Sequence, residues 1–203
     1  MRCEHKQILV KYLPKETVEF IAKKIEQEQV SFKITPPRRT KLGDYSNDIV
    51  SGQHRITVNS GLHPVRFLIV TLHEFAHLYV YKKYGRKVAP HGREWREMFA
   101  QQLQEAIALK YIPQELATLI EVHKHELPRD FFQRKDVVVA MEFIEHRNED
   151  ASPLFLLKEG EVFLFENQQW CVKEKLRTRY KCKNLSDGKT YIVPGSVWVK
   201  KTS

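Results

Sequence analysis

The chain has 203 residues, of which 42% are hydrophobic, and a formal net charge of +9. This length accommodates one domain or two small ones. The hydrophobic fraction is large enough to form a packed core, which excludes a disordered chain. Residues 1–6 contain no apolar signal segment, and the longest apolar runs are interrupted by charge well short of a membrane span. We therefore expect a protein of the cytoplasm with no membrane segment.

The cysteines support this location. Cys3, Cys171 and Cys182 make an odd count and contain no Cys-x-x-Cys pair. This pattern argues against a disulfide framework and against a zinc ribbon. Free thiols are typical of the reducing cytosol.

The first part of the chain alternates helical and extended patterns. Residues 14–29 begin with Pro14 and carry apolar residues at helical spacing, which predicts a helix. Residues 30–35, 40–45 and 55–59 predict the strands of a small sheet. An edge strand of such a sheet is a natural place for an extended substrate, because a peptide can pair with its free backbone groups.

The residues from 73 to 77 read His-Glu-Phe-Ala-His inside an apolar run over 65–81, which predicts a largely buried helix. His73 and His77 lie on one helix face and can both bind one metal ion. Zinc is expected, because two imidazoles and a third ligand leave an open position for water. Glu74 can reach that water as general base. The alternative is two core histidines bonded to backbone carbonyls, with Glu74 in a salt bridge.

The third ligand follows this helix. Metzincins are excluded, because Val80 and Lys83 occupy the places of their glycine and third histidine. One candidate is His91, which a tight turn could return to the metal. The others are Glu94 and Glu97, as a ligand or as an acceptor for a ligand histidine.

Residues 93–109 predict the next helix, with an apolar stripe at four-residue spacing. The stripe consists of Trp95, Phe99, Leu103 and Ile107. We interpret it as core packing against the metal helix. For Trp95, a role in base stacking or in a substrate pocket is the alternative.

A connecting region follows. Residues 113–124 predict a short helix, and 130–147 are ambiguous between a helix and a β-branched strand. Residues 148–153 are typical of a linker. His123 and His125 lie among charges, and we interpret them as surface histidines.

The C-terminal part has short strands that suggest a small barrel of the SH3 or Tudor kind. They are predicted at 162–165, 170–173, 178–184, 189–193 and 197–200. The dipeptide Asp187-Gly188 predicts a hairpin turn.

Positive charge is concentrated in the same part. From residue 171 onward, nine lysines and arginines accompany two acidic residues. This imbalance indicates a polyanion partner, most commonly nucleic acid, with a merely solvated basic surface as the alternative. Strand periodicity would place one basic row on a single face, consisting of Arg177, Arg179, Lys181 and Lys183. A second basic cluster, open to the same two interpretations, consists of Lys33, Arg38, Arg39 and Lys41.

The His-Glu-x-x-His motif, followed by His-Gly-Arg-Glu-Trp at 91–95, resembles the SprT-like or Spartan-like metalloproteases. The similarity covers roughly residues 14–110 and includes a strand pair at 39–45 and 55–59. The resemblance implies zinc on His73, His77 and His91, with Glu74 as catalytic base. It also implies cleavage of proteins bound or crosslinked to DNA, with DNA as activator.

The C-terminal region departs from many members of that family, which end in a four-cysteine zinc ribbon. A bacterial-type subgroup with a cysteine-poor, β-rich end is more similar to the stretch Thr-Arg-Tyr-Lys-Cys at 178–182. The departure leaves DNA binding by this end as a separate hypothesis.

We therefore predict an α+β fold with three parts. These are a zincin-like metalloprotease core at 1–112, with helices packed on a small β-sheet, a helical connector at 113–150, and a basic SH3/Tudor-like domain at 151–203. The expected function is a zinc-dependent endopeptidase of DNA-bound proteins, associated with the nucleoid if the source is bacterial. The alternatives are a nucleic-acid-binding protein with a structural or inactive zinc site and a metallohydrolase of another bond.

Overall fold

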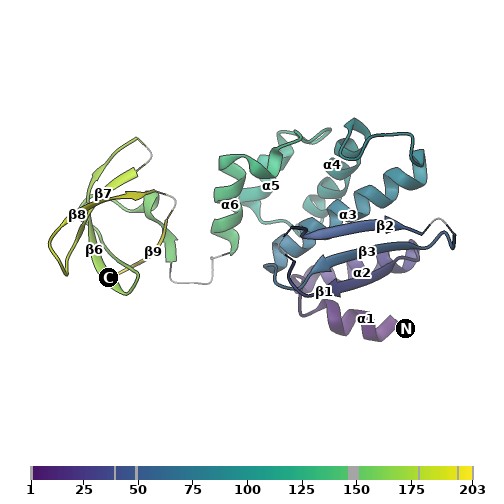
Figure 1. Ribbon diagram of the computed structural model, residues 1–203, viewed down its shortest axis with the longest axis horizontal. Helices are drawn as coiled ribbons and strands as arrows, with labels where there is room; N and C mark the ends of the chain where they lie inside the picture. The colour runs from purple at the N-terminus through teal and green to yellow at the C-terminus, as the bar shows by residue number, and fades with distance from the viewer. Residues whose placement is uncertain are drawn as a thin grey trace. The chain divides into compact units, whose positions relative to one another are not determined.

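The computed structural model describes residues 2–38, 40–48, 50–145, 151–177, 179–195 and 197–202 (Figure 1). The chain divides into two compact units, residues 1–137 and 138–203. The first unit contains α1 (Arg2–Leu9), a 3-10 turn (Lys15–Thr17), α2 (Val18–Gln27), β1 (Ser31–Thr35), β2 (Gly43–Asn47), β3 (His54–Asn59), α3 (Pro64–Tyr84), α4 (Arg93–Ala108), α5 (Gln114–Glu121) and a 3-10 turn (Phe131–Gln133). The boundary falls within α6 (Lys135–Glu145).

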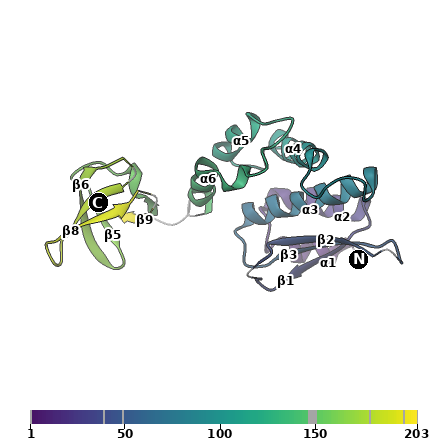
Figure 2. The same cartoon turned by 45° about the horizontal axis from the view of Figure 1, so that its top comes forward.

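The sheet of the first unit has the strand order β1-β3-β2 in the described part of the chain. β1 runs parallel to β3, and β2 runs antiparallel to it, with Tyr45 opposite Ile56. The helix α3 packs against β2 and β3, and α4 packs against α3 (Figure 2). The predicted strands are confirmed with small shifts, and β2 is an edge strand that lies beside α3.

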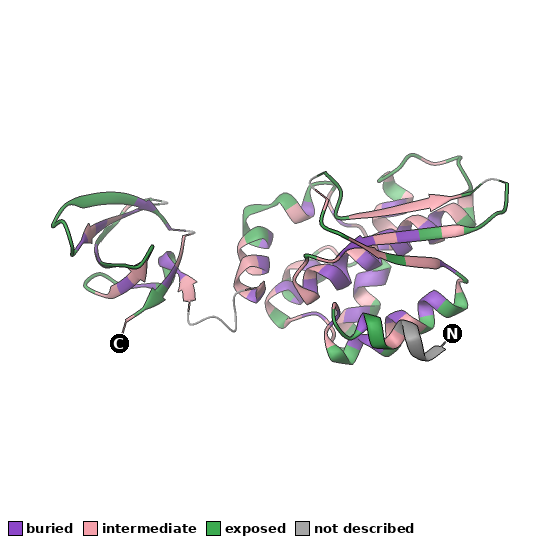
Figure 3. Cartoon of the chain, turned by 60° about the horizontal axis from the view of Figure 1, so that its bottom comes forward, coloured by how far each residue is buried: buried purple, intermediate pink, exposed green. Residues whose placement is uncertain are grey.

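The long helix α3 forms the centre of this unit, as its apolar sequence predicts. Pro64 takes the first helical position, and the His63 side chain accepts a hydrogen bond from the Val65 backbone N–H. Gly85 ends the helix with φ 63°, a conformation that glycine adopts without strain. Buried residues recur along the helix (Figure 3). A polar group at a buried position of α3, such as Glu74, therefore sits in surroundings with little water.

One buried amide sets the position of β2. Asn59, at the end of β3, is 2% exposed. Its Nδ2 donates to the backbone carbonyls of Lys41 and Arg38, at 2.7 and 3.3 Å, and its Oδ1 accepts from Arg38 Nε at 2.9 Å. These bonds fold the segment before β2 back onto the end of β3, so that β2 starts at Gly43.

Several predicted elements differ from the structure. The helix α1 was not predicted, because its charged sequence lacks a clear apolar stripe. The predicted helix at 14–29 is a 3-10 turn followed by α2. The ambiguous region at 130–147 forms a 3-10 turn and then α6, so its β-branched residues lie in a helix. Neighbouring structure overrides such weak local preferences.

The second unit contains a sheet with the order β4-β9-β5-β6-β7-β8 in the described part of the chain. Its elements are β4 (Ala151–Pro153), a 3-10 turn (Leu154–Leu156), β5 (Val162–Phe165), β6 (Gln168–Lys175), β7 (Arg179–Asn184), β8 (Thr190–Pro194) and β9 (Trp198–Lys201). All pairings are antiparallel, and the core includes Phe163, Trp170 and Tyr180. A barrel of the SH3 or Tudor kind stays a prediction.

The five predicted strands and the Asp187-Gly188 turn are confirmed. The linker prediction is wrong for 151–153, which form β4 and pair with β9. The partner of β4 comes from the far end of the unit, so local composition gives no sign of it. Residues 146–150 lie outside the described residues.

Candidate metal centre

Three histidines from two segments meet beside α3. His73 and His77 lie one turn apart on the helix, with ring centroids 5.0 Å apart. The Nε2 atom of His91 lies 3.2 Å from Nε2 of His73 and 3.0 Å from Nε2 of His77. Within the described residues, this is the group of His, Cys, Asp or Glu side chains that could hold a metal ion, with its ligand atoms within 4.8 Å of one another.

A tight turn brings His91 to the other two histidines. Its backbone has φ 56°, in the left-handed region, which costs a residue other than glycine about 1–2 kcal/mol. The Gly92 N–H closes the turn by donating to the Ala89 carbonyl at 2.9 Å. A Cβ on Gly92 would lie 2.9 Å from that same oxygen, so only glycine fits the turn without a shift.

Burial keeps the three imidazoles neutral. It lowers the pKa of His73 to about 3 and that of His77 to about 4, and neighbouring histidines add to both shifts. Burial also lowers the pKa of His91, with a further contribution from Arg129. Neutral imidazoles offer lone pairs, which is the form that binds metal.

This donor set fits a divalent metal ion. One proton can link two neutral imidazoles, but it cannot satisfy three nitrogens that converge on one point. A cation at that point would accept all three lone pairs. Three histidine nitrogens with room for a further ligand are typical of catalytic zinc.

An aromatic side chain packs against all three rings. Trp95 on α4 is 7% exposed, and its ring centroid lies 4.5 Å from those of His73 and His91 and 5.1 Å from that of His77. Phe99 and Leu103, from the same predicted stripe, are also buried. Three of the four stripe residues are buried and Ile107 is half-buried, which agrees with core packing, and Trp95 also contacts the imidazoles.

The carboxyl group of Glu74 is enclosed between α3 and β2. Glu74 is 5% exposed. Burial, followed by the charge of Asp44, raises its pKa to about 8, and a hydrogen bond from the Tyr45 backbone N–H opposes that shift. A Cβ on Gly43 would lie 2.5 Å from Glu74 Oε1. β2 can approach this carboxyl group because Gly43 has no side chain.

Tyr45 was missed by the sequence reasoning. Its ring lies nearly parallel to that of His77, with centroids 6.4 Å apart and 6° between the planes. Its hydroxyl lies 3.0 Å from Nδ1 of His54. Strand periodicity places Tyr45 on the same face as Gly43, so the signal was present once β2 was known to flank the motif.

Arg96 and Glu126 were also missed. Arg96 Nη1 donates to the backbone carbonyl of His91 at 3.2 Å, and its Nε donates to Glu126 Oε1 at 2.9 Å. Glu126 lies far along the sequence, so no local motif could identify it. The alternative ligands Glu94 and Glu97 do not belong to the histidine group, and Glu97 pairs with Arg93 at 2.8 Å.

Two basic candidates of the first unit, Arg38 and Lys41, are already engaged, whereas Lys33 is exposed on β1. The Arg38 guanidinium binds Asn59 and Thr57. Lys41 pairs with Asp44 at 2.7 Å and is 60% exposed at its side chain. Arg39 lies outside the described residues.

The basic row of the second unit has only part of the predicted geometry. Arg179, Lys181 and Lys183 alternate along β7 with buried residues, so they share the outer face. Lys181 pairs with Glu174 at 2.7 Å, which reduces the free positive charge of the row. The prediction that Arg177 lies in the same strand is wrong, because Arg177 is an exposed residue in a bend before β7.

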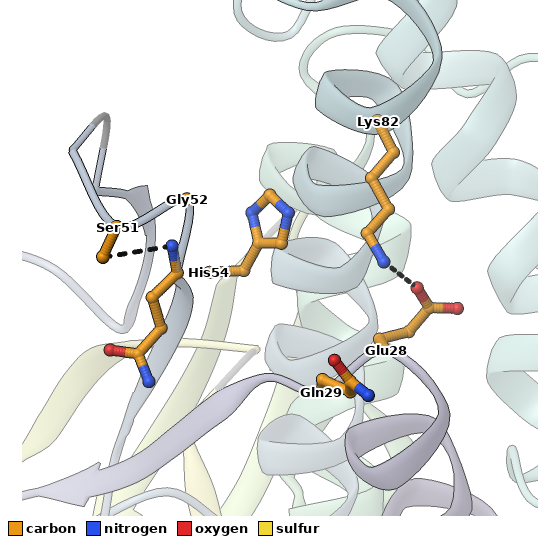
Figure 4. Close-up of a pocket in the computed structure, with 7 residues that line it drawn as sticks. Glu28, Gln29, Ser51, Gly52, His54 and Lys82 are labelled. Carbon is orange, nitrogen blue, oxygen red and sulfur yellow. Dashed lines mark hydrogen bonds and ion pairs between the residues drawn. The ribbon is translucent and has the colours of Figure 1, made fainter.

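Two further features do not involve the three histidines of the metal centre. His125 is exposed as expected, but His123 is half-buried against Phe131, with ring centroids 5.7 Å apart. A separate polar pocket of about 660 Å³ lies at the end of α3 (Figure 4). It is lined by Glu28, Gln29, Ser51, Gly52, Gln53, His54 and Lys82.

Comparisons with known proteins found a local similarity to two curated proteins. Over 34 residues the chain is 62% identical to Protein SprT of Yersinia pseudotuberculosis serotype O:1b (strain IP 31758) and of Yersinia pestis. The match covers 17% of this chain and 19% of each relative, so it is local. No solved structure matches the chain significantly. In the part of the chain that the structure describes, no helix has the length and apolar character needed to cross a membrane.

A family model supplies the wider relationship. The model of the SprT-like family matches residues 10–126, which is more than half of the chain and includes α3, the His91 turn and Glu126. This chain belongs to the SprT-like family.

Proposed function

We propose that the chain is a zinc-dependent endopeptidase of the SprT-like type. The observation that carries the proposal is the convergence of three imidazole nitrogens, two of them on α3, together with the buried carboxyl group of Glu74, the residue next to His73 on that helix. In this proposal His73, His77 and His91 hold the zinc, and Glu74 is the general base. A purely structural metal site would not need that carboxyl group.

The residues divide the chemistry between them. Zinc bound to three neutral imidazoles would lower the pKa of a bound water to about 7 and polarise the scissile carbonyl. Glu74 accepts the proton of the attacking water and delivers it to the leaving amine. Its raised pKa suits this exchange, and a cation on the neighbouring histidines would bring that pKa down toward neutrality.

The fold offers a place for an extended substrate, as in a zincin-like core. β2 is an edge strand, and it lies against α3 at the position of Glu74. A substrate paired with the free edge of β2 would run past the metal centre. Main-chain pairing depends little on sequence, so it suits a peptidase that cuts many proteins.

We further propose that the substrates are DNA-bound or DNA-crosslinked proteins. The support is the charge of the second unit, where Arg179 and Lys183 extend from the outer face of β7. Each phosphate contact made by such a side chain would release counterions and strengthen binding at low salt. This proposal places the protein in the cytoplasm, and at the nucleoid if the source is bacterial.

The deciding experiment digests a DNA-binding protein with the zinc-loaded chain, with and without single-stranded DNA. The Glu74→Gln variant is the matched control. Cleavage that requires both Glu74 and DNA supports the whole proposal, and cleavage without DNA supports the peptidase alone. Zinc and DNA binding without any cleavage would favour the alternative, a nucleic-acid-binding protein with a structural or inactive zinc site.

A further inference from the structure

One side chain of α4 holds the turn that carries His91. The guanidinium of Arg96 donates from Nη1 to the His91 carbonyl at 3.2 Å. The Nε and Nη2 atoms of the same group both donate to Glu126 Oε1. The Arg96 side chain is 23% exposed and that of Glu126 is 39% exposed. Arg96 thus connects the third histidine to the segment after α5.

The position of His91 is less constrained by secondary structure than that of the other two histidines. His73 and His77 are fixed by the hydrogen bonds of α3, whereas His91 precedes α4 and has φ 56°. The carbonyl and the imidazole of His91 are attached to the same Cα, so a displacement of the backbone at this residue would move both. A hydrogen bond to that carbonyl opposes the displacement.

We propose that Arg96 is a positioning residue for metal binding. It fixes the His91 carbonyl and thereby keeps Nε2 of His91 beside the other two Nε2 atoms, and Glu126 in turn fixes Arg96. Arginine suits this role because its planar fork can bind a carbonyl and a carboxylate at once, whereas a lysine ammonium cannot reproduce that geometry. The inference rests on the metal site of the proposed function.

The test measures zinc affinity of the metal-stripped full chain by competition with a chromophoric chelator. The variants are Arg96→Lys, Arg96→Ala and Glu126→Gln. Arg93→Ala is the matched control, because Arg93 also lies on α4 and pairs with a carboxylate, Glu97, but is 75% exposed. Residues that orient a metal ligand typically change affinity about 10- to 100-fold. We expect such a loss in both Arg96 variants, a smaller loss in Glu126→Gln, and a change within about twofold in the control.

A double-mutant cycle separates positioning from general destabilisation. In the His91→Ala background, Arg96→Lys should cause no additional loss of zinc affinity, because the imidazole that Arg96 positions is gone even though the backbone carbonyl of residue 91 remains. The visible absorption of bound cobalt should shift in Arg96→Lys but not in Arg93→Ala. Thermal unfolding of each metal-free variant identifies any that fail to fold. If the Arg96 variants fail, the zinc affinity of Glu126→Gln, which alters a partly exposed residue, tests the inference instead.

The outcomes are distinct. If His91→Ala lowers zinc affinity but Arg96→Lys and Glu126→Gln match the control, the inference is overturned and the metal site stands. An equal loss from Arg96→Lys with and without His91 also overturns the inference, because the effect would then arise elsewhere. If His91→Ala leaves the affinity unchanged, the proposed metal site falls together with the inference.

Discussion

Gly43 on β2 and Glu74 on α3 are in direct contact. A Cβ at Gly43 would lie 2.5 Å from Glu74 Oε1 and 2.7 Å from Cγ1 of Val70, both too short for real atoms. The absence of a side chain at one position of an edge strand therefore determines where the carboxyl group of the proposed general base can lie.

Gly43→Ala should displace that carboxyl group. We expect a destabilisation of about 1–3 kcal/mol, as for other overpacked sites, and a fall in turnover of at least about tenfold, because a misplaced base loses most of its effect. Urea unfolding and peptidase assays check this, with zinc content as a third measurement. Ser46→Ala, a change on the opposite face of β2, serves as the control. Normal turnover in Gly43→Ala would show that the contact is unimportant.

Glu74→Gln should retain zinc and lose turnover. The amide has nearly the same shape but cannot accept the proton, and a general base contributes about 100- to 10,000-fold to rate. Metal analysis and an assay on an unfolded protein substrate measure the two effects separately. A variant that still cleaves at the normal rate would rule out Glu74 as the base.

The free energy of unfolding of the metal-free protein should depend on pH through the buried carboxyl group of Glu74. Its folded pKa, about 8, exceeds the ordinary value of 4.5. The neutral form is therefore favoured on folding, and this contribution is present below pH 4.5 and lost as the pH rises through 8. Wild type should lose stability relative to Glu74→Gln over that window, by up to about 1.4 kcal/mol per pH unit. If chemical denaturation gave the same pH dependence of stability for wild type and Glu74→Gln, the raised pKa of Glu74 would be contradicted.

His91→Ala should reduce zinc affinity by more than the roughly 100-fold that a residue outside the ligand set can cause. Glu97→Ala should leave it unchanged, because Glu97 pairs with Arg93. Equilibrium dialysis of both variants provides the measurement. Loss of zinc only in the glutamate variant would transfer the role of third ligand to Glu97.

Reversing the charge of both Arg179 and Lys183 should weaken binding of single-stranded DNA. If each contacts one phosphate, the slope of log affinity against log salt should fall by about 1.4. Lys181→Ala is the internal comparison, and its effect should be smaller because Lys181 already pairs with Glu174. Equal salt slopes for wild type and the double variant would place the DNA contact elsewhere.

The sequence predicted those parts of the fold and of the site that depend on residues close together in the chain. The buried helix α3, its two histidines and the five later strands each have a local periodic signal. The family resemblance, confirmed by the match over 10–126, selected His91 among the candidates for the third ligand. The contact between Gly43 and Glu74 could not be predicted, because it depends on how β2 packs on α3. The pairing of Arg96 with Glu126 and the strand β4 were missed for the same reason, since their partners are distant in sequence.

The left-handed backbone of His91 has a consequence for engineering. At φ 56° the left-handed backbone costs less conformational free energy for a glycine or an asparagine than for a histidine. Screens for heat resistance of the metal-free protein should therefore favour replacement of His91. The proteins recovered would be more robust and would lack the third imidazole, so thermal tolerance and metal binding are opposed at this one position.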